Sequence, residues 1–271
     1  MNDMFSLKEK VIVVTGGTGV LGHAFVNAIA DAGGTVAILG RNEAVATERA
    51  NAINSKGGKA IVLIADVTKQ EDLERVCKQL LDQTGRIDGL VNAAGGNMPG
   101  AVVAPEADIF NLNMEALKQV MDLNLFGTLL PTQVFGREIA KTGNGSIINI
   151  SSMATKQAIT KVLGYSMAKA AIDIYTKWFA VELANRFGDK IRMNAIMPGF
   201  FLTEQNRTLV TNPDGSLTAR GNLIVNGTPF KRLGRAEELQ GALVWLLSDA
   251  ASFVSGTVVE VDGGFAAFSG V

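Results

Sequence analysis

The sequence predicts an α/β fold in which helices cover both faces of a doubly wound parallel sheet. Short β-branched runs alternate with amphipathic helical segments along the chain, and the first run ends in a glycine-rich turn. Such alternation implies right-handed crossovers between parallel strands. No linker, repeat or charge block interrupts the 271 residues, of which 47% are hydrophobic, so we expect a single domain over residues 1–271.

The elements are expected in the following order. The first strand is predicted at residues 10–15, followed by a glycine turn at 16–22 and a helix that runs to about residue 31. Further strands are predicted at 35–39, 59–64, 87–91 and 256–261, with an amphipathic helix at about 69–83. Ten residues follow the last predicted strand, which is too short for a separate substrate domain of the kind that epimerases and dehydratases carry.

The glycine turn indicates a dinucleotide site. Glycines let the backbone turn tightly against a pyrophosphate, whose charge then lies at the positive end of the following helix. A plain glycine-rich turn is the alternative. Asp66 follows the third strand and residues 92–96 follow the fourth, at the carboxyl ends where a doubly wound sheet binds its ligand.

Tyr165, Lys169 and Ser152 form a candidate proton-transfer centre. Positions four apart on a helix share one face, so the Lys169 ammonium can lie beside the Tyr165 phenol. A nearby cation lowers the pKa of a phenol from about 10 toward the working pH of a general acid or base. The Ser152 hydroxyl would then bond the substrate oxygen.

With these motifs the chain resembles the short-chain dehydrogenase/reductase family over nearly its whole length. The family's Thr-Gly-x-x-x-Gly-x-Gly motif is present except that Val20 replaces the middle glycine, with Gly19 beside it. The family's Asn-Asn-Ala-Gly segment is Asn92-Ala93-Ala94-Gly95, so hydrogen bonds of the missing asparagine must be made differently. The resemblance implies an NAD(P)-dependent oxidoreductase with a single Rossmann domain and a seven-stranded parallel sheet.

The resemblance also implies the catalytic roles. Tyr165 would be the acid/base, Lys169 would lower its pKa and hold the nicotinamide ribose, Ser152 would position the substrate oxygen, and Asn124 would order a water. Alternatives remain for each: Asn124 could cap a helix kink, Ser151 could replace Ser152, and Lys169 could be a solvated helix residue.

The expected cofactor contacts come from the strand ends and from the segment after the sixth strand, which would hold the nicotinamide carboxamide. They are Gly16, Thr18, Gly19, Val20, Leu21, Gly22, Arg41, Asn42, Asp66, Val67, Asn92, Ala93, Ala94, Gly95, Tyr165, Lys169, Pro198, Gly199, Phe201 and Thr203. NADP(H) is expected over NAD(H), because the second strand ends without a carboxylate and Arg41 could pair with the 2′-phosphate. A solvated Arg41 is the alternative.

A lid over the active site is expected at about residues 200–233. Arg207 would grip a substrate carboxylate in a bidentate fashion, unless it is merely a solvated residue. The expected substrate contacts are Gly96, Asn97, Ser152, Met153, Gln205, Asn206 and Arg207.

Within the family, residues 92–97, 202–207 and 261–271 resemble the sugar-acid reductases of D-mannonate oxidoreductase (fructuronate reductase) type. That resemblance implies interconversion of a keto-uronate and an aldonate. Reductases of 5-keto-gluconate and of 3-oxoacyl thioesters are the close alternatives. A non-catalytic dinucleotide sensor is a remote one, since it should have lost the tyrosine or the lysine.

Composition excludes several other classes. A net charge of −1 and a pI near 5.9 give no footprint for nucleic acid. One cysteine, Cys77, and one histidine, His23, allow neither an intrachain disulfide nor a zinc site, so no metal is expected. His23 lies at the nucleotide end, out of reach of a serine-hydrolase triad. No membrane span or secretory segment is expected, so cytoplasm is the default, and the resemblance implies a homotetramer.

Overall fold

The computed structural model describes residues 4–203 and 206–270, and its described residues form one parallel sheet with the order β3-β2-β1-β4-β5-β6-β7. The expected doubly wound, seven-stranded fold is confirmed. The strands are β1 (Val11–Thr15), β2 (Thr35–Gly40), β3 (Lys59–Ile64), β4 (Gly89–Asn92), β5 (Gly145–Ile150), β6 (Ile191–Pro198) and β7 (Val258–Val261).

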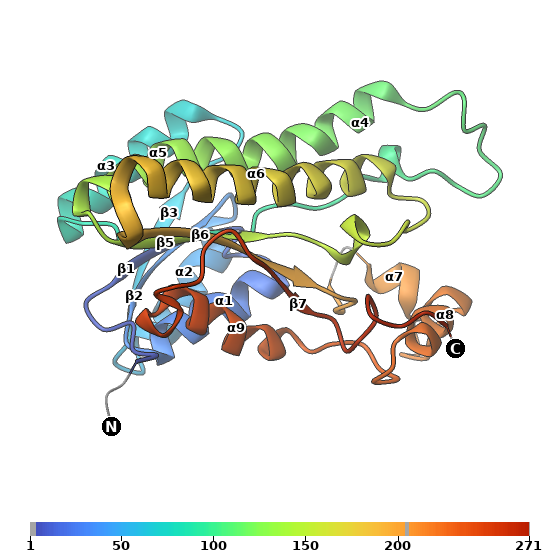
Figure 1. Cartoon of the computed structure of the whole chain (residues 1–271). Coiled ribbons are helices and arrows are strands. Elements are labelled where there is room, and N and C mark those ends of the chain that lie inside the picture. The colour runs from blue at the N-terminus through green and yellow to red at the C-terminus, as the bar shows by residue number, and fades with distance from the viewer. Residues whose placement is uncertain (1–3, 204–205, 271) are drawn as a thin grey trace.

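Helices cover both faces of this sheet (Figure 1). One face packs against α1 (Val20–Asp31), α2 (Glu43–Asn54) and α9 (Gln240–Leu247). The other face packs against α3 (Gln70–Thr84), α5 (Gly127–Thr142) and α6 (Leu163–Phe187), and α4 (Met114–Met121) precedes α5. Because both faces are covered, the central strands β1 and β4 are buried along their whole length, as their unbroken apolar runs predict.

Two predicted strand starts were wrong by two residues, each for a local reason. The fourth strand begins at Gly89 rather than at residue 87, because the Asp88 carboxylate accepts a hydrogen bond from the Val11 amide at 2.8 Å. The last strand begins at Val258 rather than at residue 256, because Gly256 has a φ of 78° and forms a turn.

The strand order reverses between β1 and β4, which is where a doubly wound sheet opens a crevice at its carboxyl edge. Thr15 and Asn92 are neighbours at this edge. The Thr15 hydroxyl accepts hydrogen bonds from the amides of Ala93 and Ala94, each at 3.1 Å. These bonds fix the loop after β4 against β1. They lie in the segment where the family has a second asparagine and this chain has Ala93.

The 200–233 segment, where a lid was expected, contains α7 (Arg207–Val210) and α8 (Ala219–Gly227). Thr218 caps α8 by accepting a hydrogen bond from the Gly221 amide at 3.0 Å, which is a helix start that the sequence analysis missed. Both helices lie beyond the carboxyl ends of the strands, close to the C-terminus (Figure 1). None of the helices in the described part of the chain has the length and apolar composition needed to cross a bilayer.

Candidate active site

Ser152, Tyr165 and Lys169 meet at the carboxyl end of β5. Tyr165 lies in the first turn of α6 and receives a hydrogen bond from the Ser152 hydroxyl. Lys169 lies one turn later, and its Nζ is 5.6 Å from the centroid of the Tyr165 ring and donates to the Ile150 carbonyl at 2.7 Å. The structure therefore brings together the three residues of the predicted proton-transfer centre.

Burial dominates the electrostatics of this cluster. It raises the pKa of Tyr165, and the Ser152 hydrogen bond lowers it only in part. It lowers the pKa of Lys169 to about 8, whereas the negative charge of Asp173 raises it. The expected net lowering of the Tyr165 pKa by Lys169 is not seen, because a buried phenol loses the hydration that stabilises its anion.

The two adjacent serines have different surroundings. Ser151 is 1% exposed, and its hydroxyl donates to the Asp173 carboxylate on α6. Ser152 turns the other way, toward Tyr165, and its hydroxyl also accepts a hydrogen bond from the Ala154 amide at 3.2 Å. The geometry thus brings Ser152, and not Ser151, to the phenol.

Asn124 lies in a π-helical turn, Asp122–Phe126, between α4 and α5. Its side chain is fully buried and bonds both backbone groups of Gly96, accepting from the amide at 2.9 Å and donating to the carbonyl at 2.6 Å. It also donates to the Val120 carbonyl at 2.8 Å, one turn back in the helix. Asn124 therefore fills the opened helical turn and holds the loop after β4.

Gly95 lies between Asn124 and Lys169. A Cβ atom at this position would be 2.7 Å from Asn124 Oδ1 and 3.4 Å from Lys169 Nζ. The absence of a side chain at Gly95 is therefore required for the close packing of these two polar groups.

The glycine turn approaches the loop after β4 very closely. Gly16 has a φ of 64°, and a Cβ there would be 2.7 Å from the Ala93 carbonyl oxygen. The helix α1 starts after Gly19, and no side chain in the described part of the chain caps it. The amide groups of its first turn, from Val20, Leu21 and Gly22, have no acceptor within the helix, which suits the binding of a pyrophosphate.

The other end of the crevice carries Arg41 and Asp66. An Arg41 Nη1 atom lies 3.9 Å from the Asp66 carboxylate, and the Arg41 side chain is 76% exposed. Burial alone would raise the pKa of Asp66, but hydrogen bonds from Thr68 and the charge of Arg41 leave it lowered. Asn42 caps α2 by accepting from the Val45 amide at 3.1 Å. The expected NADP(H) contacts thus lie together, but Asn42 already has a structural partner.

Arg49 is a cation beside the glycine turn that the sequence analysis missed. It reaches from α2 and donates to the carbonyls of Gly17 at 2.5 Å and Gly19 at 2.8 Å. A signal was available: position 49 lies three residues after Ala46 and four before Ile53, both on the buried side of α2. Arg49 therefore supports the carbonyl side of the turn whose amides face the crevice.

Other predicted cofactor residues lie at the strand ends. The Asn92 side chain turns into the core and donates to Thr132 Oγ1 and Asn149 Oδ1, each at 2.9 Å, so only its backbone faces the crevice. Thr18 packs against Gly40 at the end of β2, where a Cβ on Gly40 would be 2.7 Å from Thr18 Oγ1. Val67 is buried after β3.

The segment after β6 bends sharply toward β7. The Gly199 amide donates to the Val261 carbonyl at 3.0 Å, and a Cβ on Gly199 would be 2.6 Å from the Asp262 Cα. Pro198 ends β6, and Phe201 is 6% exposed. These backbone contacts fix the start of the 200–233 segment beside the crevice.

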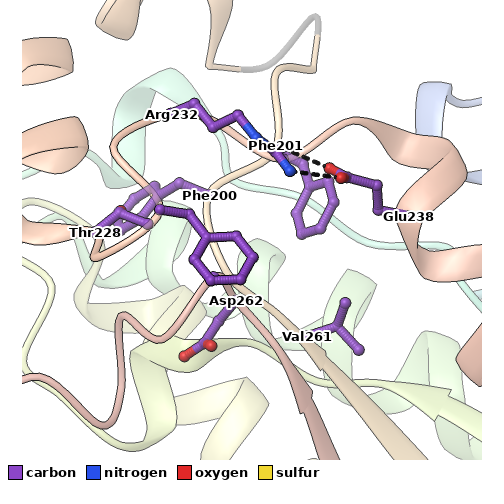
Figure 2. Close-up of a pocket in the computed structure, with 10 residues that line it drawn as sticks. Phe200, Phe201, Thr228, Arg232, Glu238, Val261 and Asp262 are labelled. Carbon is purple, nitrogen blue, oxygen red and sulfur yellow. Dashed lines mark hydrogen bonds and ion pairs between the residues drawn. The ribbon is translucent and has the colours of Figure 1, made fainter.

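A small pocket of about 100 Å³ lies at the base of the 200–233 segment (Figure 2). Arg232 spans its upper side and donates to the Glu238 carboxylate at 2.6 and 2.7 Å, and the Phe201 ring lies beside this pair. Hydrogen bonds from Arg232 and from the Arg235 amide lower the pKa of Glu238 to about 2. The ion pair ties the end of the segment to the turn before α9.

The predicted substrate residues do not all point into the site. Gln205 lies outside the described residues. The Asn206 amide is engaged locally, accepting from the Thr203 amide at 2.8 Å and donating to the Phe201 carbonyl at 2.7 Å. Arg207 is exposed at the start of α7.

On the opposite wall, Asn97 follows Gly96, and its buried Oδ1 has no hydrogen-bond partner among the described residues. Met153 is 2% exposed, directly after Ser152. Arg220 of α8, which the sequence analysis missed, donates to Thr160 Oγ1 and to the Thr160 carbonyl, each at 3.3 Å. This contact links the 200–233 segment to the loop after Ser152. Within residues 4–203 and 206–270, no three His, Cys, Asp or Glu side chains gather in a way that could hold a metal ion.

Comparison with known proteins places this geometry among oxidoreductases. A family model described as enoyl-(acyl carrier protein) reductase matches residues 18–266. An uncharacterised oxidoreductase of Bacillus subtilis (strain 168), UxuB, is 42% identical, with 98% of each chain covered.

Two solved structures are similar over almost the whole chain. A candidate D-mannonate oxidoreductase from Haemophilus influenzae with bound NAD is 40% identical with a TM-score of 0.89, and the match covers 98% of each chain. A gluconate 5-dehydrogenase from Burkholderia cenocepacia J2315 in complex with NADP and tartrate is 30% identical with a TM-score of 0.88, again over 98% of each chain.

Proposed function

Because the chain belongs to the short-chain dehydrogenase/reductase family and is an NAD(P)-dependent oxidoreductase, we propose that it interconverts a keto group and a secondary alcohol of a sugar acid, with D-fructuronate and D-mannonate as the reference pair. The main support for this reaction is the cluster of Ser152, Tyr165 and Lys169 beside Gly95. The similarity to the Haemophilus protein supports the substrate class.

In the proposed mechanism Tyr165 transfers the proton. A nicotinamide held at the crevice would supply or accept the hydride. Ser152 holds the substrate oxygen, and Tyr165 gives it a proton during reduction or removes one during oxidation. The raised pKa of Tyr165 keeps the phenol protonated at neutral pH, which suits reduction. Lys169 holds a positive charge beside the phenol and would also hold the ribose of the nicotinamide.

Asn124 would order a water beside Lys169. Its Nδ2 and Oδ1 atoms are already bonded to Gly96 and Val120, so the asparagine acts mainly by fixing the backbone around that water. The proton that leaves Tyr165 could then be replaced from solvent along this path.

The cofactor is proposed to be NADP(H) in preference to NAD(H). Arg41 is exposed at the end of β2, and its contact with Asp66 at 3.9 Å is long enough to be exchanged for a stronger one with a 2′-phosphate. Arg49 adds positive charge at the same end of the glycine turn. The similar solved structures hold NAD in one case and NADP in the other, so cofactor identity must be measured on this chain.

We propose that the 200–233 segment is the substrate lid and that Arg207 binds the substrate carboxylate. Arg220 is a second cation on the same lid, and its contacts with Thr160 at 3.3 Å are long for hydrogen bonds. Asn97 would receive a hydrogen bond from a substrate hydroxyl, since its buried Oδ1 has no partner among the described residues. Asn206 would contribute less, because its amide already holds the Phe201–Thr203 backbone.

The test is a panel of keto-uronates, keto-gluconates and 3-oxoacyl thioesters, assayed with NADH and NADPH. The highest kcat/KM on a keto-uronate is expected. Arg207→Ala should raise KM for the acidic sugar while leaving KM for a neutral ketose of equal size unchanged. Turnover of acyl thioesters alone would replace the sugar-acid proposal with the oxoacyl reductase alternative.

We also propose that the protein forms a homotetramer. One face of α6 exposes three large apolar side chains, Ile174 (64%), Trp178 (59%) and Val181 (58%). Contact with another subunit would remove this apolar surface from water, which is energetically favourable. Light scattering on the purified protein should give four times the 28.6 kDa chain mass, and Trp178→Glu should lower it.

A further inference from the structure

Asp173 is a half-buried carboxylate one helical turn beyond Lys169 on α6. It has no part in the four-residue centre formed by Asn124, Ser152, Tyr165 and Lys169. Its Oδ1 accepts a hydrogen bond from the hydroxyl of Ser151, which is 1% exposed. The Ser151 amide in turn donates to the Ile196 carbonyl of β6 at 2.8 Å. The carboxylate is therefore fixed between α6 and the ends of β5 and β6.

This arrangement connects Asp173 to Lys169 through the backbone. Lys169 Nζ donates to the carbonyl of Ile150 at 2.7 Å, and the peptide group that carries this carbonyl leads directly into Ser151. Asp173 and Lys169 are also four residues apart on one helix, so they share a face. Lys169 is 4% exposed, and a buried ammonium needs a compensating negative charge or several hydrogen bonds.

We propose that Asp173 is a positioning residue, whose carboxylate, fixed by Ser151, holds the positive charge of Lys169 in the buried site. This inference rests on the proposed catalytic role of Lys169. It assigns Ser151 a task different from that of Ser152: Ser151 anchors the carboxylate behind the lysine, and Ser152 meets the substrate in front of it.

The other groups that surround Lys169 are neutral, so Asp173 is the carboxylate that acts on it among the described residues. Tyr165 lies on the same helix, and its phenol is kept neutral by burial, which raises its pKa. The end of β5 contributes the neutral Ile150 carbonyl, the loop after β4 brings Gly95, and the turn between α4 and α5 brings the neutral side chain of Asn124. Among the described residues, the charge that acts on the Lys169 pKa is that of Asp173.

The sign of the effect follows from these surroundings. Burial lowers the pKa of Lys169 to about 8, and Asp173 opposes that lowering. The lysine therefore loses its positive charge as the pH rises through about 8. Removing the negative charge at position 173 should move this loss to lower pH, by about one unit, as is typical for an opposite charge at short range.

Asp173→Asn is the decisive variant, because asparagine keeps the shape and can still accept the Ser151 hydrogen bond. The Lys169 ammonium is titrated by NMR in protein labelled with 13C at lysine Cε, with Lys169→Arg identifying its signal. The midpoint should fall by about one pH unit in Asp173→Asn. It should stay at the wild-type value in Asp189→Asn, a matched variant that removes a negative charge from an 83% exposed side chain near the far end of α6.

Kinetics provide the second measurement. The alkaline limb of the kcat profile should move to lower pH in Asp173→Asn, return toward wild type in Asp173→Glu, and move by an intermediate amount in Ser151→Ala, which leaves the carboxylate without its anchor. If Asp173→Asn does not fold, Ser151→Ala alone decides, and an unchanged Lys169 midpoint in it overturns the proposal.

The failures of this inference and of the proposed function differ. A wild-type midpoint in folded Asp173→Asn would refute the role of Asp173, even if Lys169→Ala were inactive. A shifted midpoint together with normal turnover by Lys169→Ala would instead uphold the electrostatic coupling and refute the catalytic role of the lysine.

Discussion

Replacing Gly95 by alanine would place one methyl group between Asn124 and Lys169. The new Cβ would lie 2.7 Å from Asn124 Oδ1, closer than real Cβ contacts come, and 3.4 Å from Lys169 Nζ. Asn124 cannot retreat freely, because it is fully buried and makes hydrogen bonds to Gly96 at 2.6 and 2.9 Å and to Val120 at 2.8 Å. Either these bonds lengthen, at about 1 kcal/mol each, or the loop after β4 shifts by several tenths of an ångström.

Both outcomes displace groups that the proposed mechanism requires in place. A misplacement of about 1 Å in an active site can cost roughly 10²-fold in rate, so kcat of Gly95→Ala should fall by one to two orders of magnitude. Steady-state kinetics with the best substrate measure kcat, and the fluorescence of bound NADPH measures cofactor affinity. Gly136→Ala is the matched control, because a Cβ there meets nothing closer than 3.6 Å. Since Gly136 is inside α5, alanine should stabilise the fold by up to about 1 kcal/mol and leave kcat unchanged. Retention of more than half the wild-type kcat by Gly95→Ala would refute this reasoning.

Three further outcomes are expected. Tyr165→Phe should lower kcat by about 10²–10⁴-fold, whereas Cys77→Ser should leave it near wild type, since burial raises the pKa of that thiol to about 11 and keeps it unreactive. Arg41→Ala should lower the ratio of kcat/KM with NADPH to kcat/KM with NADH about tenfold. Arg49→Ala should weaken the binding of both cofactors alike, because Arg49 supports the glycine turn that both would use. An unchanged ratio in Arg41→Ala would show that Arg41 has no role in the choice of cofactor. Glu238→Gln should lower the Tm above about pH 5, and the difference from wild type should vanish toward pH 2: a carboxyl whose folded pKa is lowered from 4.5 to about 2 stabilises the fold above its unfolded pKa and loses that contribution as the pH falls.

Features encoded by local sequence were the most predictable. The third strand was predicted with the bounds that β3 has, because its β-branched run is flanked by glycines on one side and by Asp66 on the other. The meeting of Tyr165 and Lys169 follows from helical spacing alone. The crevice between β1 and β4 follows from the reversal of strand order that parallel crossovers create.

Features that depend on side-chain direction in three dimensions were not predictable. The direction of the Asn92 side chain is one example: because a strand alternates its faces, this side chain enters the core between β5 and α5. The spacing of Arg49 from Ala46 and Ile53 indicates the buried side of α2, but the contact of that side with the glycine turn depends on the packing of α2 beside α1. The pairing of Ser151 with Asp173 joins residues 22 positions apart on different elements. Such contacts arise from packing, so the sequence alone left Arg49 and Asp173 unremarked.

The π-helical turn that carries Asn124 gives the 114–142 segment one residue more than a regular helix needs. Removal of one residue from 122–126 would restore regular α-helical spacing without rotating the side chains that follow. Thr128, Thr132 and Phe135 would therefore stay buried toward the sheet. What a single-codon deletion there would take from the enzyme is the position from which the buried Asn124 side chain reaches the backbone of Gly96.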